Sequence, residues 1–140
     1  MEKKVILLIE DNPDDIELTL RVLKKSKILN EVVVAHDGEE ALEYLLGKKS
    51  IVPAVVLLDL NLPGTDGRDV LERIKADPDL RKIPVVILTT SASPSDIQLC
   101  YREGASSYII KPIRFDDFLK KVRTLKEYWF ETVALPTHSG

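Results

Sequence analysis

The sequence predicts an α/β fold with a doubly wound, five-stranded parallel sheet and five helices. Short apolar runs recur along the chain with amphipathic stretches between them, which is typical of parallel strands covered by helices. The first, third and fourth runs are almost wholly apolar, as central strands buried on both faces are. Right-handed crossovers favour the strand order 2-1-3-4-5, with the switch point of the sheet between strands one and three.

Each predicted strand is a short apolar run. The five strands cover Lys4 to Ile9, Glu31 to Ala35, Ala54 to Leu58, Val85 to Thr89 and Ser107 to Ile110. Because neighbouring parallel strands end at the same edge of a sheet, the residues that follow these runs are expected to lie together.

The helices are predicted in the gaps between the strands. The first begins near Pro13, since proline suits the first turn of a helix, and carries Ile16, Leu20 and Leu23 at helical spacing. The second helix covers about Gly38 to Leu46 and the third roughly Arg68 to Ala76. The fourth starts at Ser93, Pro94 and Asp96 and ends at Gly104. The fifth has an apolar face that consists of Phe115, Phe118, Leu119, Val122 and Leu125.

The composition indicates one globular domain over residues 1–140, with a core at 4–127 and an aromatic tail at 128–140. The chain is 44% hydrophobic and 31% charged, with a formal net charge of -3, so it lacks the basic footprint of a nucleic-acid-binding protein. Its one cysteine, Cys100, is expected to be a buried structural thiol in a reducing cytoplasm. No run approaches the ~20 apolar residues that span a membrane, so we expect a cytoplasmic protein without a membrane partner.

Three acidic residues stand at the ends of two predicted strands. Glu10 and Asp11 close the first strand and Asp59 closes the third. Three carboxylates at one sheet edge repel one another, and they stay ionised together only beside a divalent metal and a basic partner. Thr89 and Lys111 follow the fourth and fifth strands. These groups together suit the transfer of a phosphoryl group.

Over residues 4 to 127 the chain resembles the receiver domain of two-component response regulators, a flavodoxin-like (CheY-like) fold. The resemblance rests on the pair Glu10 and Asp11, the stretch DLNLPGTDG from Asp59 to Gly67, Thr89, and Lys111 with Pro112. It implies a stand-alone signalling domain in a phosphorelay. Such a domain is not an enzyme in the usual sense, because it catalyses only its own phosphorylation and dephosphorylation.

The resemblance also assigns roles. Asp59 is the expected phosphoacceptor, and Mg²⁺ is the expected cofactor, bound by the Asp11 and Asp59 carboxylates and the Asn61 backbone carbonyl. Glu10 is expected to act on the metal through a water molecule, because Mg²⁺ keeps several of its waters. The two glycines of the stretch, Gly64 and Gly67, are expected to serve backbone turns.

Three further residues are expected to respond to the phosphoryl group. Lys111 pairs with Asp59 before phosphorylation and with a phosphoryl oxygen afterwards, and Thr89 donates its hydroxyl to another phosphoryl oxygen. The neighbouring Thr90 is an alternative donor. Tyr108 matches the switch aromatic of the family, which turns inward as the threonine moves.

The expected partners are a sensor histidine kinase, on the resemblance a bacterial phytochrome, and an unknown downstream protein. The tail contains Tyr128, Trp129 and Phe130, which either form a partner site or fold back on their own helix. A homodimer through the fifth helix and the tail is our hypothesis.

Three other functions compete with this interpretation. The first is an aspartyl-phosphate phosphatase or phosphotransferase that resembles the haloacid-dehalogenase group. Such enzymes require a second aspartate two residues after the nucleophile, where this chain has Asn61. An FMN-binding flavodoxin needs hydroxyls and amides after its first strand, whereas the stretch EDNPDD repels phosphate. The third is a receiver-like binding module that is not phosphorylated, and the intact acid set argues against it.

Overall fold

The computed structural model describes residues 5–47, 52–127 and 129. The strands β1 (Ile6–Ile9), β2 (Val32–Ala35), β3 (Val55–Leu58), β4 (Val85–Thr89) and β5 (Ser107–Ile110) form one parallel sheet. The helices are α1 (Pro13–Lys25), α2 (Gly38–Leu46), α3 (Gly67–Ala76), α4 (Pro94–Arg102) and α5 (Phe115–Lys126). The strand order is β2-β1-β3-β4-β5, which confirms the predicted fold class and topology.

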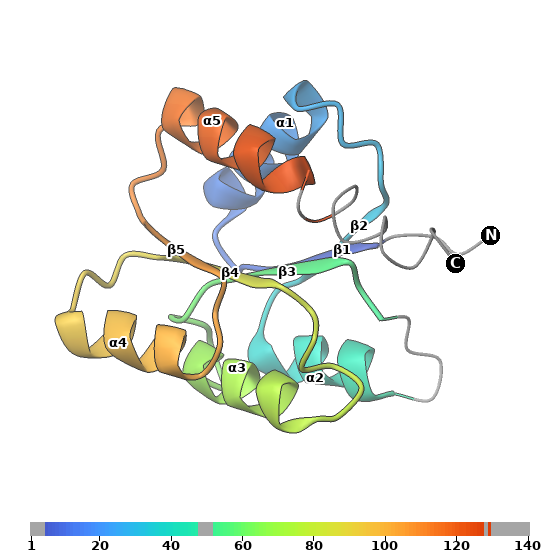
Figure 1. The fold of residues 1–140 in the computed structure, drawn as a ribbon, viewed down its shortest axis with the longest axis vertical. Helices are drawn as coiled ribbons and strands as arrows, with labels where there is room; N and C mark the ends of the chain where they lie inside the picture. The colour runs from blue at the N-terminus through green and yellow to red at the C-terminus, as the bar shows by residue number, and fades with distance from the viewer. Residues whose placement is uncertain (1–4, 48–51, 128, 130–140) are drawn as a thin grey trace.

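Helices cover both faces of the sheet. Figure 1 shows α1 and α5 on one face and α2, α3 and α4 on the other. Because side chains alternate along a strand, Leu7 and Ile9 of β1 pack into the core beneath α2, α3 and α4, whereas Ile6 and Leu8 pack beneath α1 and α5. Cys100 is buried in the first of these cores, as predicted for a structural thiol.

The observed elements differ from the predicted ones at their ends. β2 starts at Val32 rather than Glu31, and β3 starts at Val55 rather than Ala54. These two flanking residues still bond to the sheet: Ile6 N donates to Glu31 O at 2.9 Å and Ala54 N donates to Val5 O at 2.7 Å. The predicted start of the first strand at Lys4 lies outside the described residues.

The register of the central strands determines where the polar residues emerge. Ile9 pairs with Leu58 in β3, and Asp59 N donates to Ile9 O at 3.0 Å. In the neighbouring pair β4 and β5, Thr89 pairs with Ile110, and Lys111 N donates to Thr89 O at 2.7 Å. The carboxyl ends of β1, β3, β4 and β5 therefore present their polar residues along one edge.

Only one residue of the predicted tail is described. Trp129 is 4% exposed and packs with the α1 and α5 core, which favours folding back over a surface role for this side chain. Tyr128 and residues 130–140, Phe130 among them, lie outside the described residues. Within the described ranges, no helix has both the length and the apolar character needed to cross a membrane.

Candidate functional site

The three predicted carboxylates meet at the edge of the sheet. One carboxylate oxygen from each of Glu10, Asp11 and Asp59 lies within 4.8 Å of the others. Glu10 and Asp59 are buried, whereas Asp11 is exposed. A cluster of carboxylate oxygens that is open on one side suits a hard divalent cation, which prefers oxygen ligands and retains water. The residues present therefore fit the expected Mg²⁺.

The chain turns into α1 directly after the acid pair. Asn12 caps this helix, because its side chain accepts hydrogen bonds from Asp14 N at 2.9 Å and Asp15 N at 3.1 Å. The cap fixes the direction in which the first turn leaves the sheet edge. As a result Asp15 lies against the site, which the sequence did not predict.

Lys111 is the cation of the site. Its Nζ lies 2.7 Å from Glu10 Oε1, 2.7 Å from Asp15 Oδ2 and 3.1 Å from Asp59 Oδ2, and its side chain is 7% exposed. Burial alone lowers the pKa of Lys111, but the hydrogen bonds to Asp15, Glu10 and Asp59 outweigh burial and raise this pKa. The ammonium is therefore held charged at neutral pH.

The raised pKa of Glu10 indicates that the Lys111 ammonium alone does not neutralise the three carboxylates. Burial raises the pKa of Glu10 from 4.5 to about 7, the hydrogen bond from Lys111 opposes this, and the charge of Asp59 adds to it. Each added cation would favour the ionised carboxylates. The electrostatics thus agree with the oxygen geometry in favouring a metal at this place.

Thr89 lies at the end of β4 and is fully buried, whereas Thr90 is exposed. The side-chain amide of Asn61 donates to Thr89 Oγ1 at 3.2 Å and to Thr90 Oγ1 at 3.1 Å. In addition, Asn61 N donates to Asp59 Oδ1 at 3.0 Å. Asn61 therefore links the ends of β3 and β4 through its side chain, a contact that the sequence did not signal.

A second polar network holds the loop after Thr89. Arg68 of α3 binds Asp96 of α4 with two bonds, from Nε to Oδ1 at 2.8 Å and from Nη2 to Oδ2 at 2.7 Å. The hydroxyl of Ser91 donates to the same carboxylate. The hydrogen bonds from Arg68 and from Ser91 lower the pKa of Asp96 to about 2. Tyr108 of β5 joins this network, since its hydroxyl donates to Ser91 O at 2.8 Å.

The two glycines after Asp59 have different roles. Gly64 has a φ of 71° and forms a turn that favours glycine, as predicted. Gly67 was predicted to serve a turn as well, but it is the first residue of α3. A Cβ there would lie 2.5 Å from Leu60 Cα. Gly67 therefore allows α3 to approach the backbone of Asp59 and Leu60, which follow β3.

An α/β domain with acids, a threonine and a lysine gathered at the carboxyl edge of its parallel sheet carries the groups that phosphoryl transfer requires. Residues 6–123 match the response regulator receiver domain. The chain belongs to that family.

Similar proteins agree with this assignment. The chain is 43% identical over 137 residues to response regulator Rcp1 of Synechocystis sp., covering 95% of this chain and 93% of Rcp1. The crystal structure of Mn²⁺-bound Rcp1 has a TM-score of 0.81 at 42% identity, covering 92% of this chain and 96% of that one. The phosphorylated cyanobacterial phytochrome response regulator RcpA has a TM-score of 0.82 at 41% identity, covering 94% and 96%.

Proposed function

We propose that the protein is a phosphorelay switch in which Asp59 accepts a phosphoryl group from a histidine kinase in a Mg²⁺-dependent reaction. The observation that carries the proposal is the convergence on Asp59 of an ammonium and two further carboxylates from separate parts of the chain. A carboxylate nucleophile, a site for a hard cation and a fixed positive charge are what phosphoryl transfer requires.

Asp11, Asp59 and the Asn61 backbone carbonyl would hold the metal, with Glu10 acting through a water molecule. When bound, Mg²⁺ neutralises the carboxylates and accepts oxygens of the incoming group. The Mn²⁺-bound form of Rcp1 supports a divalent cation in this family.

Lys111 and Thr89 would hold the phosphoryl group. Lys111 already lies 3.1 Å from Asp59 Oδ2, so its ammonium can pass to a phosphoryl oxygen without leaving the site. Thr89 is preferred over Thr90 because it is buried at the strand end, whereas Thr90 is exposed. The oxygens of both threonines accept from Asn61, so either hydroxyl hydrogen is left to donate. Tyr108 would sense movement of this loop through its bond to Ser91 O.

The test is intact-mass spectrometry after incubation with acetyl phosphate and Mg²⁺. We expect the wild type to gain one phosphoryl group and Asp59→Asn to gain none. Asp69→Asn, an exposed change of the same charge, is the control and should be labelled like the wild type. Equal labelling of Asp59→Asn would refute the assignment, and release of phosphate over many turnovers would favour the phosphatase alternative instead.

The partner that we propose is a histidine kinase of the phytochrome type, in the cytoplasm. The likeness to RcpA, a cyanobacterial phytochrome response regulator, supports this choice. Purified candidate kinases, phosphorylated on histidine, should transfer the group to the protein at different rates. A phytochrome kinase that transfers no faster than unrelated kinases would contradict the proposal.

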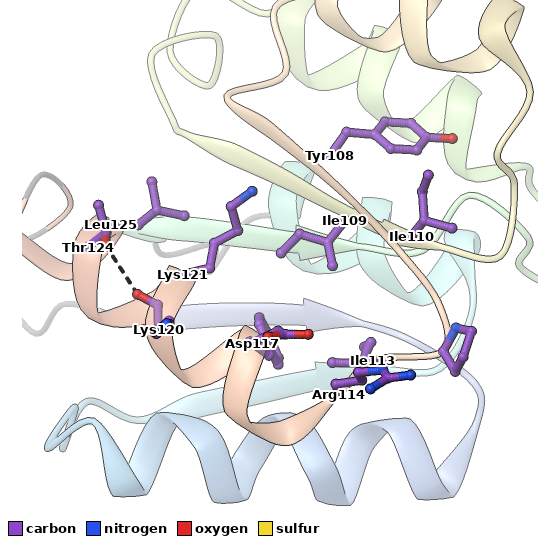
Figure 2. Close-up of a pocket in the computed structure, with 12 residues that line it drawn as sticks. Tyr108, Ile109, Ile110, Ile113, Arg114, Asp117, Lys120, Lys121, Thr124 and Leu125 are labelled. Atoms are coloured by element: carbon purple, nitrogen blue, oxygen red, sulfur yellow. Dashed lines mark hydrogen bonds between the residues drawn. The ribbon is translucent and has the colours of Figure 1, made fainter.

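We also propose that the core at 4–127 forms homodimers through α5. A groove of about 780 Å³ lies between β5 and α5. Its lining includes the apolar side chains Ile109, Ile110, Ile113 and Leu125 and the charged side chains Arg114, Asp117, Lys120 and Lys121. Figure 2 shows Ile109 and Ile113 on the α5 side of β5, whereas Ile110 points to the other side, beside Tyr108. Because Trp129 is buried in the core, the surface offered to a second copy is the groove rather than this tryptophan.

Sedimentation velocity tests the dimer. Ile110 is 43% exposed, so Ile110→Asp should convert a dimer to a monomer without unfolding the protein. Leu29→Asp, a change at an 87% exposed leucine away from the groove, is the control. A wild-type monomer at all concentrations would end this proposal and leave the phosphoacceptor assignment untouched.

A further inference from the structure

Asp15 is a partner of Lys111 that none of the roles above uses. Its Oδ2 lies 2.7 Å from Lys111 Nζ, as close as Glu10 Oε1. An acid in the first turn of a helix usually needs no special role, because it interacts favourably with the positive end of the helix dipole. Asp14 occupies the same turn and is exposed, and its carboxylate makes no contact with Lys111 among those found in the described residues. The ion pair with Lys111 thus distinguishes two adjacent acids of equal charge.

The three partners of Lys111 differ in what they do when a cation is present. Glu10 and Asp59 belong to the carboxylate cluster, so a divalent ion there competes with Lys111 for their oxygens. The same ion repels the ammonium. Asp15 is not part of that cluster, and its side chain, 21% exposed, remains available to Lys111.

We propose that Asp15 is a positioning residue that keeps the ammonium of Lys111 beside Asp59 once a divalent cation occupies the acid cluster. This inference rests on the proposed function. In the transfer from acetyl phosphate, an Asp59 oxygen forms a bond to phosphorus while the bond from phosphorus to the acetate oxygen breaks, and acetate leaves with the electron pair. Lys111, held by Asp15, then meets the charge on the transferred oxygens without having to return from solvent.

The kinetic test compares Asp15→Asn with Asp14→Asn, which removes the same charge one residue away. With acetyl phosphate and saturating Mg²⁺ we expect Asp15→Asn to slow phosphorylation by about tenfold, because the ammonium is misplaced at the reacting centre. Asp14→Asn should phosphorylate like the wild type. Equal rates in the two variants would overturn the proposal.

A double-mutant cycle separates positioning from a general structural effect. In the Lys111→Met background, Asp15→Asn should cause no further loss of rate, because the group that Asp15 positions is gone. If Asp15→Asn slows Lys111→Met by the same factor as it slows the wild type, Asp15 does not act through Lys111.

A third measurement needs no phosphorylation. In the Mg²⁺-loaded wild type the Lys111 ammonium should give a protected ¹⁵Nζ signal in NMR spectra. Asp15→Asn should lose this signal on Mg²⁺ addition but keep it in EDTA, whereas Asp14→Asn should keep it in both. A signal that survives Mg²⁺ in Asp15→Asn would refute the positioning role. Failure of the proposed function would appear instead as undiminished labelling of Asp59→Asn.

Discussion

Replacing Glu10 by glutamine should stabilise the metal-free protein at neutral and alkaline pH. The side chain is 1% exposed, and burial raises the pKa of its carboxyl from 4.5 to about 7. Between these pH values the folded protein holds a proton that the unfolded chain has released. Because the unfolded state then binds fewer protons, the free energy of unfolding falls as pH rises through this window.

The size of the effect follows from the shift. The pKa of Glu10 rises from 4.5 to about 7 on folding. At about 1.4 kcal/mol per pKa unit, this rise corresponds to about 3 kcal/mol of unfolding free energy. Glutamine resembles the protonated acid and does not ionise. The Glu10→Gln variant should therefore match the wild type near pH 4 and exceed its unfolding free energy by about 3 kcal/mol above pH 8.

Urea denaturation in EDTA across this pH range measures the difference. Glu17→Gln, a change on the exposed face of α1, is the control and should follow the wild type at every pH. Saturating Mg²⁺ should close the gap by stabilising the ionised wild-type carboxylate. Parallel stability profiles of wild type and Glu10→Gln, with a constant separation from pH 4 to about 8, would show that Glu10 titrates normally and that the linkage argument fails here.

Two backbone positions give further predictions. Gly67→Ala should lower stability by about 1–3 kcal/mol in urea denaturation, because the added Cβ meets the backbone of Asp59 and Leu60 at the start of α3. A neutral result would show that α3 can shift away. Lys27, the residue after the C-cap of α1, has a φ of 62°. Lys27→Gly should raise stability by about 0.5–1 kcal/mol, since glycine relieves the left-handed strain at some entropic cost. A destabilised Lys27→Gly would mean that contacts of the lysine side chain outweigh the strain.

Much of the site could be predicted because a parallel sheet determines where its strand ends lie. The apolar runs of β1 and β3 end at Glu10 and Asp59, and the pairing of Ile9 with Leu58 brings these acids together. The same holds for Thr89 and Lys111, which follow adjacent strands. Strand periodicity carries this positional information. The choice of Thr89 over the neighbouring Thr90 came from the family resemblance instead.

The sequence did not predict contacts that depend on where a side chain points from a loop or a helix. Asp14 and Asp15 are identical residues in one turn, and only the cap at Asn12 and the angle at which α1 leaves the sheet decide which of them reaches Lys111. The bridge from Asn61 to both threonines is of the same kind. Trp129 was open to two interpretations because hydrophobicity alone does not distinguish a core contact from a partner contact.

The electrostatics of the site explain why these contacts exist together. Lys111 binds Glu10, Asp15 and Asp59 at once, so its pKa rises although burial opposes it. Glu10, in the same group, has its pKa raised, because burial and Asp59 outweigh the single ammonium. Both shifts have the same cause, because the site holds more carboxylates than the single Lys111 ammonium can neutralise. A divalent cation at the carboxylates would correct that imbalance. On our proposal, Asp15 would then be the partner that holds Lys111 in place for the phosphoryl group.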